Sequence, residues 1–176
     1  MLRIPLFLSL VFLVACSGGE NHQKVGIDPP GAVEAEKAAT PDSFDASFAD
    51  GMTETVFQHY LKLRTALVND DGDDAAAAAG NLAESLGNNY PELKKAATVI
   101  SITEDVAAQR AAFAAMTEEI EPLISQGITG GTIYKQYCPM AFDNAGAEWF
   151  SDAKEIRNPY FGERMLKCGK VVATLE

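Results

Sequence analysis

Apolar residues recur every three or four positions through the central part of the sequence, and this spacing constrains the fold more than any other feature. In residues 53–69 they stand at Val56, Tyr60, Leu63 and Leu67. Spacings of four, three and four place these side chains on one face of an α-helix. The pattern therefore predicts an amphipathic helix that buries this face.

Three further segments have the same spacing. A polar turn at residues 69–74 precedes the second helix, and its last aspartates are suited to cap that helix. Pro91 is suited to the first turn of the third helix, and Ser101 with Glu104 has the spacing of a capping box that would start the fourth. The three predicted apolar stripes are Ala79, Leu82, Ala83 and Leu86; Leu93, Ala96, Ala97 and Ile100; and Val106, Phe113, Met116, Ile120 and Leu123.

Four amphipathic helices with short connections predict a mainly α fold, an up-and-down four-helix bundle. Pro122 should kink or shorten the last turn of the fourth helix, and Gly127 should end it. His59 falls on the flank of the first helix, where partial burial and a hydrogen bond are a better account than metal binding. No cluster of polar residues is expected to face the interior, so we expect the bundle to serve as a scaffold.

The N-terminal segment has the features of a secretory signal. Arg3 precedes an apolar run that is too short to span a bilayer. Leu13-Val-Ala-Cys16 resembles the lipobox of bacterial lipoproteins, which implies a signal peptide at 1–15 that is cleaved before an acylated Cys16. An ordinary signal with a chance cysteine is the alternative. Two or more acyl chains anchor a protein stably, and Ser17 favours an outer-membrane protein that faces the periplasm.

Residues 16–49 follow as a segment rich in Gly, Pro, Ala and charged residues, with no sustained hydrophobic period. Such a composition cannot bury enough apolar surface to offset its ordering entropy. We therefore expect a flexible tether here, with His22 solvated, and one folded domain at residues 50–176.

The net charge of −11 argues against a nucleic-acid partner, because phosphate binding requires basic surfaces. Removal of residues 1–15 would take away Arg3 and change the charge to −12. If Cys16 is acylated, Cys138 and Cys168 are left as one pair of thiols in an oxidising compartment.

Residues 133–176 are rich in Cys, Met and aromatic residues. We expect them to form a cap on the bundle that contains a short strand. Pro139 favours an extended conformation at Cys138, which would place Met140 on the same side of the chain. A helical turn near the other cysteine would place Met165 beside Cys168.

Two readings of these sulfurs remain open. Thiolates and thioethers are soft ligands, so Cys138, Met140, Met165 and Cys168 could hold Cu(I) or Ag(I), whereas zinc would require more Cys or His. Alternatively, Cys138 and Cys168 form a disulfide, which would close a loop of about 30 residues and contribute roughly 3–4 kcal/mol.

Enzymatic activity is not indicated, because no motif supplies a base for a cysteine nucleophile. A non-catalytic interaction module is a further alternative, in which Trp149, Phe150 and Asn158-Pro-Tyr-Phe-Gly162 present an aromatic docking surface. Core packing is the simpler role for these aromatic residues.

Several motifs resemble a bacterial family of unknown function. They are Tyr137-Cys-Pro-Met-Ala141, Gly146-Ala-Glu-Trp149, Ile156-Arg-Asn-Pro-Tyr-Phe-Gly162 and Met165-Leu-Lys-Cys-Gly169, with Tyr60-Leu-x-Leu, Ala66-Leu and Gln109-Arg-x-x-Phe113 in the helices. Members of this family occur as stand-alone lipoproteins and as the C-terminal extension of copper/silver efflux adaptors. The resemblance covers roughly residues 50–176 and implies a link to heavy-metal handling, with an efflux complex as a partner.

Overall fold

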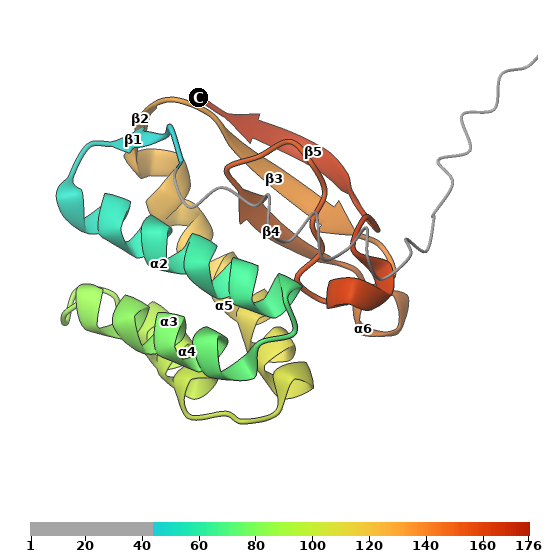
Figure 1. Ribbon diagram of the computed structural model, residues 1–176. Helices are drawn as coiled ribbons and strands as arrows, with labels where there is room; N and C mark the ends of the chain where they lie inside the picture. The colour runs from blue at the N-terminus through green and yellow to red at the C-terminus, as the bar shows by residue number, and fades with distance from the viewer. Residues whose placement is uncertain (1–43) are drawn as a thin grey trace, which may run out of the picture.

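The computed structural model describes residues 44–176, which contain four long helices and a small antiparallel sheet (Figure 1). The expected signal peptide, the acylated Cys16 and most of the expected tether lie outside the described residues. Within residues 44–176, no helix is both long enough and apolar enough to span a bilayer.

The helices α2 (Gly51–Val68), α3 (Gly72–Ser85), α4 (Pro91–Ser101) and α5 (Val106–Gly127) confirm the four predicted helices. Local chemistry explains most of their ends. The side chain of Asp71 caps α3 by accepting from the Asp74 N–H, and Pro91 occupies the first turn of α4. Helix α5 continues through Pro122 and ends at Gly127, so Pro122 does not shorten it.

The predicted start of the fourth helix is wrong. Ser101 is the last residue of α4, and the cap of α5 is Asp105, whose carboxylate accepts from the Ala108 N–H at 2.9 Å. A carboxylate at the cap satisfies an unpaired backbone donor and also faces the positive end of the helix dipole.

Consecutive helices pack against each other, and α2 also contacts α5. Figure 1 shows α3 and α4 on one side of α2 and α5, with the sheet on the other side. The predicted helix content is thus confirmed, while the up-and-down arrangement stays a prediction.

The C-terminal part forms a three-stranded sheet in the order β4-β3-β5, where β3 is Ile133–Cys138, β4 is Ala147–Ser151 and β5 is Lys170–Leu175. The predicted strand is β3, and it pairs antiparallel with both neighbours. The sequence prediction missed the other two strands. A short helix, α6 (Ala141–Asn144), and a 3₁₀ turn, η1 (Gly162–Met165), lie in the connections.

Tyr60 joins the helices to the sheet. Its ring is fully buried and stacks on Phe113 of α5 with the ring centres 5.1 Å apart. Its hydroxyl shares a 2.9 Å hydrogen bond with Thr117 of α5 and accepts from the Phe150 N–H of β4. Burial raises the pKa of Tyr60 well above its usual value by a desolvation penalty on the phenolate, so this hydroxyl remains protonated.

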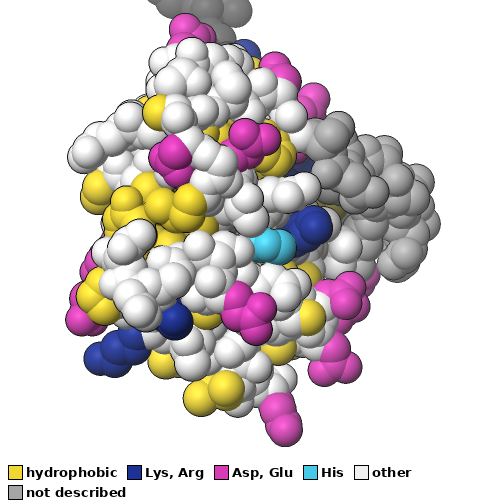
Figure 2. Space-filling model, turned by 90° about the vertical axis from the view of Figure 1, so that its left-hand side faces the viewer, with side chains coloured by type: hydrophobic (Ala, Val, Ile, Leu, Met, Phe, Trp, Pro, Cys, Tyr) yellow, Lys and Arg dark blue, Asp and Glu magenta, His cyan; other side chains and the backbone are white. Residues whose placement is uncertain are grey.

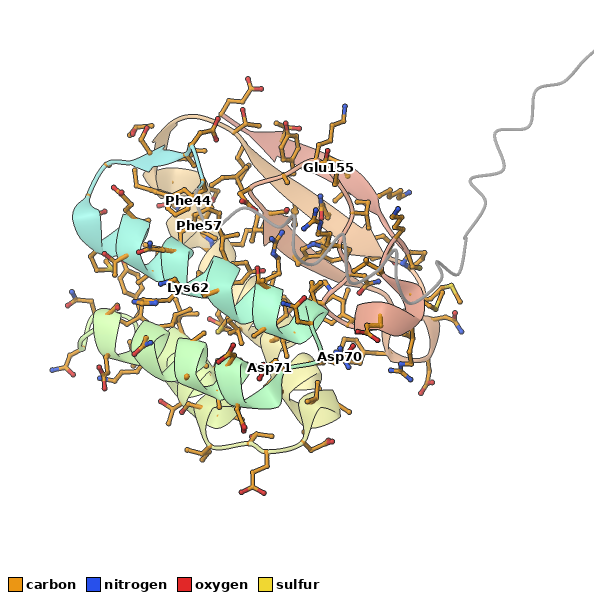
Figure 3. All side chains as sticks on the ribbon, viewed as in Figure 1. Phe44, Phe57, Lys62, Asp70, Asp71 and Glu155 are labelled. Carbon is orange, nitrogen blue, oxygen red and sulfur yellow. The ribbon has the colours of Figure 1, made fainter. Side chains whose placement is uncertain are left out.

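The packed domain begins earlier than the sequence predicted. Phe44 makes an edge-to-face contact with Phe57 of α2, Ala46 is buried, and β1 (Ser47–Phe48) pairs with β2 (Ile128–Gly130). Figure 3 labels Phe44 and Phe57, which lie next to each other beside α2. These few apolar residues have no periodicity, but the aromatic cluster on α2 gives them partners.

Candidate thiol site

The structure brings Cys138 and Cys168 together. Cys138 is the last residue of β3, and Cys168 comes two residues before β5. Because these strands pair antiparallel, with Tyr137 opposite Lys170, the two cysteines meet at one end of the sheet. Their Sγ atoms are 3.4 Å apart and both residues are buried, at 0% and 4% exposure. Both cysteines are free thiols in this structure.

The sulfur separation lies between the values that the two readings of this pair require. A disulfide bond is ~2.05 Å long, so oxidation would bring the sulfurs closer. Metal–sulfur bonds of about 2.3 Å, as for zinc, allow two sulfurs on one ion to be up to roughly 4.6 Å apart when the ion lies between them. Either product therefore requires the two sulfurs to move by the order of 1 Å.

Only one of the two candidate methionines lies as expected. Met165 is the last residue of η1 and is partly buried against the core cluster that contains both cysteines. The Cys168 N–H donates to the Met165 carbonyl at 3.0 Å, which closes the predicted helical turn. Met165 ends η1 and Cys168 follows it, so the two residues lie at the two ends of one hydrogen-bonded turn.

The expectation that Met140 shares a face with Cys138 is not met. Strand β3 ends at Cys138, and Met140 has a helical backbone conformation (φ −96°, ψ −7°), so the extended alternation has already stopped. Met140 is 42% exposed whereas Cys138 is fully buried. Pro139 favours an extended conformation before it, but it does not continue the strand beyond it.

Asn158 holds the backbone on the Cys168 side of the site. Its side-chain amide donates to the Cys168 carbonyl at 2.7 Å, and its side-chain oxygen accepts from the Tyr160 N–H at 2.8 Å. Its own N–H donates to the Leu166 carbonyl. The side chain is fully buried, so these bonds fix the loop that carries Cys168.

Gly169 brings this loop close to the core. Its φ of +151° is unfavourable for residues with a Cβ, and an added Cβ would lie 2.9 Å from the Trp149 ring and 3.0 Å from the Tyr137 carbonyl oxygen. The close approach places Cys168 beside the strand that ends in Cys138. The glycine predicted to end a helical turn thus also makes the pairing of the thiols possible.

Burial raises the pKa of the Cys168 thiol to about 11, with a smaller contribution from the hydrogen bond and charge interaction with Cys138. Burial disfavours the charged thiolate, so in the absence of metal this thiol is neutral at physiological pH. A cation that binds the thiolate would reverse this preference, because it supplies the missing opposite charge.

We predict that the native reduced protein reacts slowly with iodoacetamide. A pKa of about 11 instead of 9.0 leaves roughly 100-fold less Cys168 thiolate at pH 8, and burial slows the reaction further. Alkylation followed by mass spectrometry from pH 7 to above pH 10 should show a rate that rises steeply with pH. The denatured chain, in which both thiols are accessible, is the control, and equal rates for both states at pH 8 would contradict the assignment.

Hard ligands do not complete the site. In the described part of the chain, no three side chains of His, Cys, Asp or Glu cluster as a metal site. His59 on α2 is partly buried as predicted, but its Nδ1 has no hydrogen-bond partner among residues 44–176, and burial together with Lys62 lowers its pKa. Two carboxylates of the C-terminal part would be hard ligands: Asp152 forms an ion pair with Arg64, and Asp143 belongs to α6.

Sequence reasoning missed two buried arginines. Arg64 on α2 forms an ion pair with Asp152 at 3.3 Å and donates to the hydroxyl of Ser151 at the end of β4. Arg110 on α5 donates to the carbonyls of Pro159 and Leu67 and to the Asp70 carboxylate. Arg64 lies four residues after Tyr60 on the apolar stripe of α2, and this position could have revealed it.

Residues 56–130 match the family model described as "Protein of unknown function (DUF3347)". This segment begins in α2 and ends with β2, so it contains most of α2 and all of α3, α4 and α5, and it precedes Cys138 and Cys168. The helical part is therefore similar to an uncharacterised domain family. Neither the curated proteins nor the solved structures gave a significant match.

Proposed function

We propose that this chain is a membrane-anchored lipoprotein that faces the periplasm and binds Cu(I) or Ag(I) between Cys138 and Cys168. The observation that carries the proposal is the pair of buried thiols 3.4 Å apart, held by β3 on one side and by the loop of Asn158 on the other. Two thiolates are a sufficient ligand set for a soft monovalent ion.

The donor chemistry supports a soft ion over zinc. A structural zinc site takes four ligands from Cys, His or carboxylates, and the described residues offer only two thiols at this place. Met165, in the turn of Cys168, is the thioether suited to become a third ligand. Met140 is exposed in the turn after β3, and it joins the site only if that turn rearranges.

The role that fits such a site is a chaperone or buffer in heavy-metal tolerance, without catalysis. Acylation at Cys16 would keep the protein at the membrane, where an efflux complex could exchange metal with it. The resemblance to domains that extend copper/silver efflux adaptors supports this partner. In this proposal the helices serve as a scaffold, and the C-terminal cap carries the ligands.

We expect the reduced protein to take up one Cu(I) and lose this ability in either Cys138→Ser or Cys168→Ser. Each substitution removes one of only two thiolates, so competition with a chromogenic Cu(I) chelator should show at least a 100-fold loss of affinity. Met165→Leu should weaken binding by a smaller factor, and Met140→Leu is the matched control that should leave it unchanged. Wild-type affinity in both serine variants would overturn the site.

The alternative is that Cys138 and Cys168 form a permanent disulfide in a non-catalytic interaction lipoprotein. The same short sulfur separation favours it, because a small side-chain rotation would bring the sulfurs to bonding distance. Mass spectrometry of the protein purified without reductant decides between them. A pair that is fully oxidised and resists reduction in the native state would favour the disulfide.

A further inference from the structure

Both thiols of the site are enclosed, so part of the structure must open before anything reaches them. Cys138 is fully buried and Cys168 is only 4% exposed. Two connections adjoin the thiols. One is the loop of residues 158–169, which carries Cys168, and the other is the turn of residues 139–146, which follows Cys138 and joins β3 to β4. Access to the site therefore depends on which of these two moves more easily.

The loop of residues 158–169 is bonded to the helical part of the domain. Arg110 of α5 donates to the Pro159 carbonyl at 2.7 Å, and the Glu163 N–H donates to the Asp70 carboxylate at 3.1 Å. The buried side chain of Asn158 adds the hydrogen bonds within the loop that were described above. Moving this loop would break several of these hydrogen bonds at once, and a buried polar group that loses its partner is costly.

The turn of residues 139–146, which we call the β3–β4 turn, is held differently. Two hydrogen bonds within the turn close it: the Ala145 N–H donates to the Phe142 carbonyl at 3.1 Å, and the Gly146 N–H donates to the Ala141 carbonyl at 2.9 Å. The Phe142 ring packs edge to face on Tyr160, with the ring centres 5.4 Å apart. Ala141 is 1% exposed and belongs to the same buried cluster as the two cysteines. The turn thus contributes one aromatic contact and one small buried residue.

Three consecutive residues of the β3–β4 turn have a left-handed backbone. The φ angles are +50° at Phe142, +56° at Asp143 and +71° at Asn144. Asn and Asp adopt this conformation as single residues, but a bulky residue such as Phe seldom does, and left-handed residues rarely follow one another. The closed turn therefore stores backbone strain, which opening would release.

We propose that the β3–β4 turn is a gate, which swings outward, withdraws Ala141 from the core and gives a soft metal ion access to Cys138. Phe142 acts as the latch, because its ring is 40% exposed and rests on Tyr160. The turn lies beyond the last pair of β3 and β4, Cys138 and Ala147, so it can move while the strands stay paired. Figure 1 places α6 at the right-hand end of the domain, which is the far side in Figure 2.

This inference rests on the proposed function, in which the thiols hold the ion, and it adds how the ion enters and leaves. Strain in the closed turn and the latch oppose each other, since the strain favours opening and the ring contact favours closure. The balance between them sets how often the gate opens. The gate therefore controls the rate at which the site exchanges its ion.

The test uses the chain with Cys16→Ser and Cys168→Ser, which leaves Cys138 as the only thiol of the three cysteines. The rate of its alkylation by iodoacetamide at pH 8 is followed by mass spectrometry without metal. Phe142→Ala removes the latch and should raise the rate about fivefold or more, as expected for the loss of an aromatic pair. Phe142→Gly removes the same ring but also the strain at this position. It should react roughly fivefold more slowly than Phe142→Ala, because only glycine is left-handed without penalty.

Ile100→Val is the control for unfolding of the whole domain. Ile100 of α4 is fully buried, so the loss of one methylene group lowers global stability without touching the turn. It should leave the rate within about twofold of the parent chain. Three results would each overturn the gate: no acceleration in Phe142→Ala, a Phe142→Gly variant that is no slower than Phe142→Ala, or equal acceleration by Ile100→Val. Metal is absent and Cys168 is replaced, so a failure of the proposed metal site produces none of these results.

Discussion

Replacing Arg64 with methionine is expected to lower the free energy of unfolding by about 3–5 kcal/mol, which is typical when one partner of a buried ion pair is removed. Arg64 is 3% exposed, and its guanidinium lies 3.3 Å from the Asp152 carboxylate and donates to Ser151. Methionine would fill much of the volume but would leave Asp152 without its counter-charge. Denaturant titration followed by circular dichroism measures the loss.

Two controls separate the ion pair from the loss of a long side chain. Lys62→Met removes a cation from the exposed side of the same helix and should change stability by less than about 0.5 kcal/mol. Asp152→Asn combined with Arg64→Met removes the uncompensated charge and should recover part of the loss. A loss for Arg64→Met no larger than that for Lys62→Met would show that the pair does not join α2 to the sheet.

Burial also lowers the pKa of Arg64, because desolvation outweighs the opposing effect of Asp152. A sequence pattern cannot predict such a residue, because the stripe of α2 identifies which positions face inward but not what lies across from them. The sheet beyond α2 supplies Asp152 and Ser151, which are about 90 positions away in the chain. A buried charge becomes predictable only after its partner has been placed.

Features that depend on neighbouring residues were predicted well. The four helices and Pro91 at the start of α4 each follow from chemistry within a few positions, whereas the cap of α3 is Asp71 and not one of the last aspartates of the turn. Strands β4 and β5 were missed because their partners are distant and their patterns are weak. In β5 four of six residues are exposed, so no alternation between buried and exposed positions marks it as a strand.

The thiol site was predicted only in part for the same reason. The turn of Met165 and Cys168 is local, and its expected geometry agrees with the structure. Cys138 lies beside Cys168 because of the register between β3 and β5. The number of cysteines suggests that these two form a pair, but it does not give their positions. The prediction that Met140 shares a face with Cys138 failed, because the residue at which a strand ends depends on how far its partner strands extend.

Gly169→Ala is expected to lower the free energy of unfolding by about 2–4 kcal/mol, combining backbone strain with overpacking. Its φ is +151°, and the new Cβ would meet the Trp149 ring at 2.9 Å and the Tyr137 carbonyl oxygen at 3.0 Å. Both are fixed parts of the core and the sheet, so the loop of Cys168 must move away. Thermal and denaturant unfolding measure the loss.

Gly51→Ala is the matched control, because a Cβ at Gly51 has no heavy atom within 4 Å and alanine favours a helix. It should leave stability unchanged or raise it by up to about 1 kcal/mol. If the position of this loop is what pairs the thiols, Gly169→Ala should also weaken Cu(I) binding and slow disulfide formation, although both cysteines are present. A variant as stable as the Gly51→Ala control, with wild-type Cu(I) affinity, would show that the close approach at Gly169 does not hold the site together.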